Sequence, residues 1–182
     1  LVASDFLFRT AFPIPRDTKV RGNALVRQGG GPAANAAVAL ARLGARVAFA
    51  GAVGDDALGR KQIEDLAREN VDVAHVERVP GAGSFVSFIL VDEQDGARTV
   101  LSAPAEIPFP SDSRAALTLD PDLVLVDGWG GPAQGALARA ARGAGIPVLL
   151  DAGSARPDVR ALCESADVVI ASEAFADEWH RL

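Results

Sequence analysis

The sequence predicts an α/β protein in which a mostly parallel β-sheet carries helices on both faces. Short apolar runs of strand length alternate with stretches of helical periodicity over residues 33–70 and again from residue 122 onwards. Such alternation is typical of strand–helix–strand units, whose strands are parallel. A different pattern between these two regions predicts a small antiparallel insertion, which does not form a domain of its own.

The first part of the chain predicts two strands and two helices. Residues 1–9 form an apolar strand that Asp5 interrupts, and residues 10–31 are mixed and rich in turns. A helix over 33–43 precedes a continuous apolar strand over 46–54, which is typical of a parallel strand covered on both faces. The stretch DDALGRKQIEDLAREN then has the apolar spacing of a helix.

The middle of the chain predicts a hairpin. Residues 84–91 and 98–102 are apolar runs of strand length, and the turn EQDGA separates them. Residues 75–79 also have the composition of a strand, and we expect them to join the hairpin in one antiparallel patch. Strand–helix alternation then returns. Its strands cover 122–128, 147–153 and 167–172, and its helices cover 132–143, about 157–165, and a segment beginning at Glu173.

Charge and composition exclude several classes of partner. The net charge is −6 with acids and bases interspersed, which argues against nucleic acid or an anionic membrane as the partner. No apolar run approaches the roughly 20 residues that a membrane span requires. The N-terminus has no basic region followed by an apolar core, so we expect a cytoplasmic protein without a secretory signal.

Polar residues stand at the ends of the later predicted strands. Asp127, Asp151 and Ser172 each follow an apolar run, and Asp55 and Asp56 follow the strand over 46–54. Ligands of parallel sheets bind beyond the carboxyl ends of the strands, so these side chains predict a polar cleft. The alternative is that each one caps the helix that follows it.

Asp5 and the segment 29–35 predict contacts with a polyhydroxylated ligand. A carboxylate within an apolar strand is costly unless it is hydrogen-bonded, and sugar hydroxyls can donate to it. The glycines at 29–31 leave main-chain N–H groups accessible, and Asn35 lies in the first turn of the following helix. The alternatives are an edge-strand position for Asp5 and a local helix cap for Asn35.

The stretch GGGPAANAAVALARLG followed by AGAVGDDALG resembles the first signature of the ribokinase family, the PfkB-type carbohydrate kinases. ASD near the start, VDG and LDAG on later strands, and VVIASEAFA near the end also match in order. The resemblance implies a Rossmann-like core with a small β-lid, formed by segments of about 10–28 and 73–102. Residues 1–182 would be the N-terminal part of one such domain, with the C-terminal part of the fold missing.

The resemblance also implies roles for individual residues. Members transfer the γ-phosphoryl group of ATP to a hydroxymethyl group of a sugar, with Mg²⁺ as the metal. The positions that match contacts to the substrate hydroxyls or line the cleft are Asp5, Gly30, Gly31, Asn35 and Asp127. Asp151 matches a position near the phosphoryl path, on the ATP side.

Two departures from the family pattern bear on the ATP side of the site. Ser172 and Glu173 stand where many members have an Asn-x-x-Glu motif for magnesium and phosphate, and the form ASEAFA resembles the ketohexokinase-type branch. The family's Gly-Ala-Gly-Asp segment, which holds the anion hole and the catalytic Asp base, is absent. We therefore expect that base beyond Leu182 and expect the 182-residue chain alone to be inactive.

The resemblance leaves the sugar and the assembly open. A substrate that already carries a phosphate or sulfonate would require extra cations, and the candidates beside the lid are Lys19, Arg21, Arg27 and Arg98. Arg98 could instead pair on the lid surface. Both faces of the strand over 84–91 are apolar, which predicts a homodimer through the lid.

Two other functions fit parts of the sequence. Gly29 to Ala34 satisfies the pattern G-x-G-x-x-A of dinucleotide-binding oxidoreductases, although the preceding LVRQ is a poor buried strand. A non-catalytic sugar sensor, or pseudokinase, would bind the sugar and lack the downstream Gly-Ala-Gly-Asp segment.

Overall fold

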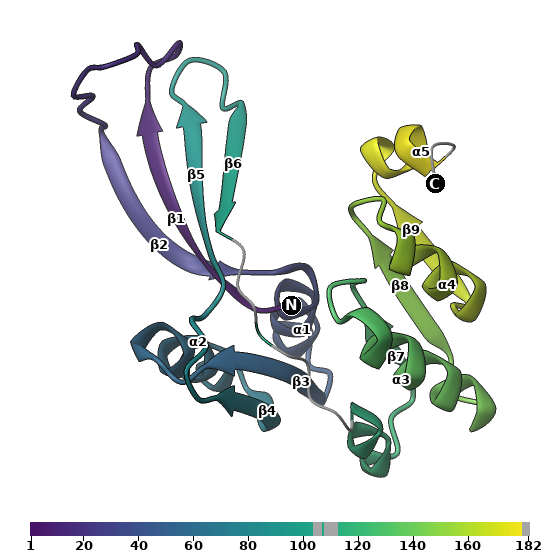
Figure 1. Ribbon diagram of the computed structural model, residues 1–182. Helices are drawn as coiled ribbons and strands as arrows, with labels where there is room; N and C mark the ends of the chain where they lie inside the picture. Colours follow the sequence, from purple (N-terminus) through teal and green to yellow (C-terminus); the bar gives the residue numbers. More distant parts are fainter. Residues whose placement is uncertain (104–106, 108–112, 180–182) are drawn as a thin grey trace.

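The computed structural model describes residues 1–103, 107 and 113–179 (Figure 1). The strands in this part of the chain are β1 (Ala3–Thr10), β2 (Ala24–Gly30), β3 (Val47–Gly54), β4 (Val71–Val79), β5 (Val86–Asp92), β6 (Arg98–Ala103), β7 (Val124–Val126), β8 (Val148–Ala152) and β9 (Val168–Ala171). The helices are α1 (Pro32–Arg42), α2 (Ala57–Arg68), the 3₁₀ helix η1 (Ser113–Leu119), α3 (Gly131–Gly143), α4 (Pro157–Ser165) and α5 (Glu173–Trp179).

A four-stranded sheet in the order β2-β1-β5-β6 projects from the helices α1 and α2 (Figure 1). β1 is antiparallel to β2 and parallel to β5, and β5 pairs with β6 as the predicted hairpin. β2 lies in the stretch over 10–31, for which the sequence predicts turns and no strand. Most side chains of β2 are exposed, and its short apolar run is followed by polar residues and glycines, so its sequence does not mark it as a buried strand.

The parallel strands are present as predicted, but they form two separate sheets. β3 pairs with β4, and β7, β8 and β9 form the second sheet. The prediction that residues 75–79 join the hairpin was wrong, because β4 runs parallel to β3 along its whole length. A groove of about 800 Å³ separates the two parallel sheets, and β3 and β7 line its opposite sides.

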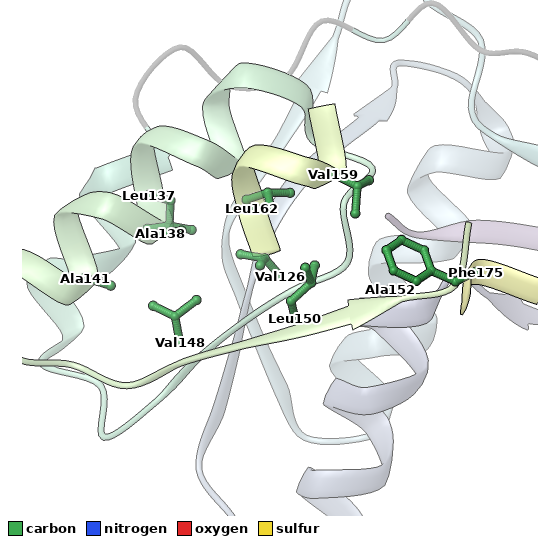
Figure 2. Packing of buried hydrophobic residues seen from close by; sticks show 10 residues of the cluster. All are labelled: Val126, Leu137, Ala138, Ala141, Val148, Leu150, Ala152, Val159, Leu162 and Phe175. Carbon is green, nitrogen blue, oxygen red and sulfur yellow. The ribbon is translucent and has the colours of Figure 1, made fainter. Parts of the chain in front are cut away.

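Each parallel sheet is packed against its own helices. α1 and α2 pack on β3 and β4, whereas α3 and α4 pack on β7 and β8. In the second group, the β8 residue Leu150 is fully buried among Val126, Val159 and Leu162 (Figure 2). This core holds the ends of β7 and β8 in place. Asp127 follows the last residue of β7, and Asp151 is the penultimate residue of β8.

The GDDALG motif ties the four-stranded sheet to α2. Asp56 caps α2 by accepting a hydrogen bond from Gly59 N at 2.7 Å. Its other oxygen accepts from Ser84 N at 2.8 Å, and Ser84 Oγ donates to Asp56 Oδ1 at 2.7 Å. Ser84 lies just before β5, so one carboxylate secures both the helix and the start of a strand.

Replacing Gly59 by alanine is expected to destabilise the fold by about 2 kcal/mol or more, because overpacking a tight interior contact costs about 1–3 kcal/mol. A Cβ atom at Gly59 would overlap the carbonyl oxygen of Gly54 and lie 2.7 Å from Ser84 Oγ. Urea unfolding would measure the loss. Gly29→Ala is the matched control, because a Cβ there meets no atom within 4 Å. Equal stability of the two variants would contradict the prediction.

Candidate functional site

A row of polar side chains crosses one face of the four-stranded sheet. Asp5 in β1 pairs with Ser87 in β5, which pairs with Ser102 in β6, and paired residues share a face of a sheet. The Asp5 carboxylate and the Ser87 side chain are neighbours across the β1–β5 pair, and Ser87 Oγ lies 3.5 Å from Ser102 Oγ. Asp5 was predicted from the sequence, whereas both serines were missed because their partners lie on other strands.

The Asp5 carboxylate lies directly against Gly30. A Cβ atom at Gly30 would overlap the carboxylate of Asp5, so a residue without a side chain lets that carboxylate lie over the end of β2. Burial raises the pKa of the Asp5 carboxyl above its ordinary value of 3.8, and the Ser87 hydrogen bond partly opposes this shift. Gly31 follows with φ 97°, a backbone conformation that favours glycine.

Asn35 lies in the first turn of α1 with its side chain exposed. No side chain caps α1 among the described residues, so the structure does not support the alternative that Asn35 is a local cap. Neither Asp5 nor Asn35 lines the groove between β3 and β7 or the cavity beside the turn after β7. Asn35 and Gly30 are brought near each other only through the short connection from β2 to α1.

Asp127, at the end of β7, is a buried carboxylate whose oxygens accept hydrogen bonds from the protein itself. Its Oδ2 accepts from the main-chain nitrogens of Leu1 and Ala33, at 2.5 and 3.2 Å. Its Oδ1 accepts from Trp129 N at 3.1 Å and Gln134 Nε2 at 2.9 Å. Asp127 therefore joins the start of α1 to the second parallel sheet and shapes the turn that carries Trp129.

The two strand-end aspartates have different surroundings. Burial would raise the pKa of Asp127, whereas the hydrogen bonds that it accepts from Gln134 and from Trp129 N act to lower it. Asp151 stands beside it, one residue past the Val126–Leu150 pair. Burial and repulsion from Asp127 raise the pKa of Asp151. The structure thus brings these two predicted residues together.

Ser172 and Glu173 stand where β9 meets α5. Ser172 Oγ accepts from Phe175 N at 3.0 Å and donates to the Gly153 carbonyl at 3.1 Å, so it caps α5. The capping alternative is therefore what the structure shows for Ser172, as it is for Asp56. The Glu173 side chain is exposed at the start of the same helix.

A cavity of about 750 Å³ opens between the start of β1, β3, the turn after β7 and the start of α4. Ser102 lines it, so the polar row of the four-stranded sheet reaches this cavity. Phe85 and Trp129 line it as an edge-to-face pair with ring centroids 5.8 Å apart. The Arg156 guanidinium lies 4.0 Å from the Trp129 ring centroid. Sequence reasoning missed Arg156.

The cations proposed from the sequence lie elsewhere. Arg27 donates to Asp65 Oδ2 at 2.5 Å and to Ser4 Oγ at 3.3 Å, on the side of the sheet that faces α2. Lys19, Arg21 and Arg98 are outside the set that lines the cavity. The described residues contain no group of three or more His, Cys, Asp and Glu side chains arranged to bind a metal.

This architecture, a parallel α/β core with a projecting sheet that bears a carboxylate over a glycine turn, is that of a sugar-kinase-like protein. The chain matches the pfkB family carbohydrate kinase pattern over residues 4–181. It belongs to that family. None of the helices in the described part of the chain has the length and apolar character that a membrane crossing requires.

Individual relatives agree with this assignment. An ATP-dependent ribose-1-phosphate kinase from Halopiger xanaduensis is 32% identical over 168 residues, which cover 88% of this chain and 56% of that protein. A candidate ribokinase from Agrobacterium tumefaciens superposes with a TM-score of 0.88 at 29% identity, covering 100% of this chain and 60% of that one. Arabidopsis thaliana ribokinase, solved with ribose and ATP, has a TM-score of 0.80 at 21% identity, covering 96% and 58%. The chain thus spans less than two thirds of each.

The oxidoreductase alternative has no support. A dinucleotide fingerprint requires its glycine turn to follow a parallel strand of the main sheet. Here the turn follows β2, which is antiparallel to β1 at the edge of the projecting sheet.

Proposed function

We propose that this chain supplies the sugar-binding half of an ATP-dependent kinase that phosphorylates a hydroxymethyl group of a ribose- or fructose-like sugar. The observation that carries the proposal is the Asp5 carboxylate, which lies over Gly30 and shares a face with Ser87 and Ser102. A carboxylate and two hydroxyls in one row suit the donors and acceptors of a polyol. Because the donor would be ATP, we place the protein in the cytoplasm.

In this proposal, the residues of the chain position the sugar. Asp5 would accept hydrogen bonds from sugar hydroxyls, while the main chain at Gly30 and Gly31 and the side chain of Asn35 would bind others. The four-stranded sheet would act as a lid that keeps water away from the reacting hydroxyl. Phosphoryl transfer depends mainly on such positioning, and we place the Asp base beyond Leu182.

On the ATP side of the site, Asp127 is poorly suited to bind a hydrated magnesium ion, and the neighbouring Asp151 is better suited. All the hydrogen bonds of Asp127 come from protein donors, and Ser172 is used as a cap. Asp151 and Glu173 remain as carboxylates that could hold Mg²⁺ through water, together with phosphate oxygens. The ion would neutralise the charge of the phosphates when bound.

The test is transfer of the γ-phosphoryl group from ATP to a panel of ribose, fructose and ribose 1-phosphate, followed by mass spectrometry of the product. Ribose 1-phosphate belongs in the panel because one relative carries that activity in its name. We expect phosphorylation by the protein that includes the Gly-Ala-Gly-Asp segment, and none by the 182-residue chain alone. Turnover by the chain alone, or no product from the longer protein, would contradict the proposal.

We also propose a homodimer through the four-stranded sheet. Phe88 in β5 and Leu101 in β6 share one face and are each 52% exposed, and Phe88 stacks on Phe6 at 5.6 Å between ring centroids. Apolar side chains on that face favour a partner of the same kind. Light scattering should give a dimer, and Phe88→Lys should give a monomer. A monomeric wild-type protein would overturn this proposal.

A further inference from the structure

We propose that Arg156, which lies over the Trp129 ring, forms a subsite for a phosphoryl group. The subsite is in the cavity that the polar row of Asp5, Ser87 and Ser102 reaches. This inference rests on the proposed function. Two sources share this chemistry: a phosphate that the sugar already carries and the terminal phosphoryl group of ATP. The first would restrict the enzyme to phosphorylated sugars.

Two contacts orient Arg156, and the ring that it lies over is itself packed against Phe85. Its guanidinium lies 4.0 Å from the Trp129 ring centroid, and Phe85 packs edge-to-face on the same ring. Arg156 Nη2 also donates to the carbonyl oxygen of Gly128. A stacked guanidinium directs its N–H donors outward in the plane of the group, which is the geometry that binds two phosphate oxygens at once.

The charge of Arg156 is only weakly neutralised by the protein. Its Nε lies 3.7 Å from Asp158 Oδ1, which is beyond hydrogen-bond distance, and the Asp158 side chain is 40% exposed. Arg156 Nη1 makes no hydrogen bond to any other described residue. The Arg156 side chain itself is only 28% exposed, so its attraction for an anion is less screened than that of a surface arginine.

Arg156 lines the cavity, so a ligand bound there can reach its guanidinium. Arg156 is the one basic side chain among the described residues that line this cavity. Asp158 is the one acidic side chain in that lining, and most of the other lining residues are apolar or glycine. Ser102 lines the same cavity and continues the row from Asp5 through Ser87. A ligand with hydroxyls at one end and a phosphoryl group at the other would therefore meet complementary groups at both.

Calorimetric titration of the full-length protein with ribose, ribose 1-phosphate and MgATP tests the subsite. We expect Arg156→Gln to weaken the binding of ribose 1-phosphate or of MgATP by about tenfold to a hundredfold, the loss expected for charge-assisted hydrogen bonds. Ribose binding should change by less than about twofold, as for a substitution away from its contacts. Arg156→Lys should recover part of the loss.

The outcomes separate the sources and the two hypotheses. A loss confined to ribose 1-phosphate assigns the subsite to the substrate, and a loss confined to MgATP assigns it to the nucleotide. Arg60→Gln is the matched control and should leave all three affinities unchanged, because Arg60 is exposed on α2 and does not line the cavity. If the wild-type protein bound ribose and Arg156→Gln changed the affinity for neither ribose 1-phosphate nor MgATP, the subsite proposal alone would be overturned. If the wild-type protein bound no sugar, the proposed function would fail as well.

Discussion

Replacing Asp5 by asparagine is expected to lower sugar affinity by about a hundredfold or more, while the fold keeps its stability. Hydrogen bonds to a charged acceptor contribute about 1.5–3 kcal/mol each, and a sugar offers more than one hydroxyl to the carboxylate. Asparagine has the same shape, so it still lies over Gly30. Calorimetric titration with the best substrate of the panel would measure the loss.

The pKa of Asp5 predicts the sign of two accompanying effects. Because burial raises this pKa above 3.8, the folded state holds the proton more tightly than the unfolded state, and ionisation at neutral pH opposes folding. Asp5→Asn should therefore leave the melting temperature at pH 7 unchanged or raise it. Sugar binding by the wild-type protein should be lost as the pH falls through the raised pKa, because protonation removes the acceptor charge.

A matched control distinguishes this loss from a general charge effect. Asp177→Asn changes an exposed carboxylate on α5 and should leave affinity and stability unchanged. Retained affinity in Asp5→Asn would remove the basis of the sugar site. A large drop in its melting temperature would show that Asp5 is needed for the structure.

Replacing Asp127 by alanine is expected to destabilise the protein by about 3–5 kcal/mol, since removing a buried charged partner leaves its donors unpaired. Four donors from Leu1, Ala33, Trp129 and Gln134 would lose their acceptor in a site that is 3% exposed. Urea unfolding at pH 7 would measure the loss. Asp127→Asn keeps one acceptor oxygen and should lose less.

The pH dependence of stability provides a second measurement on Asp127. The hydrogen bonds that Asp127 accepts from Gln134 and from Trp129 N favour its ionised form, so the stability that they contribute is lost when acid protonates the carboxylate. Asp122→Ala removes an exposed carboxylate just before β7 and serves as the control. If the Asp127→Ala protein were stable but no longer bound sugar, the prediction would be wrong and Asp127 would have the substrate-binding role that the resemblance implies.

Local patterns predicted most elements because each depends on residues close in the chain. The helix α2 carries its apolar spacing and its cap, Asp56, within one stretch of sequence. β7 and β8 are apolar runs that end in Asp127 and Asp151, and the hairpin of β5 and β6 is marked by its turn. The exposed edge strand β2 escaped prediction, because its apolar run is short and is followed at once by polar residues and glycines.

Pairing between distant segments could not be predicted in the same way. β4 has the composition of a strand, but nothing in its residues shows that it pairs with β3 and not with the hairpin. Trp129 and Arg156 belong to different strand–helix units, and only the parallel pairing of β7 and β8 brings their turns together. For the same reason, Asp127 could be read equally well as a cleft residue or as a structural one.

The sequence alone determined the α/β class, most of the elements and the family, since these follow from periodicity and motifs within short stretches. Only the tertiary structure shows that the Asp127 carboxylate accepts its hydrogen bonds from the protein and that Ser87 and Ser102 share a face of the sheet with Asp5. It also places Arg156 over the Trp129 ring. The physical reason is that hydrogen bonding, burial and charge depend on which distant side chains meet, and the order of residues in one stretch does not specify those meetings.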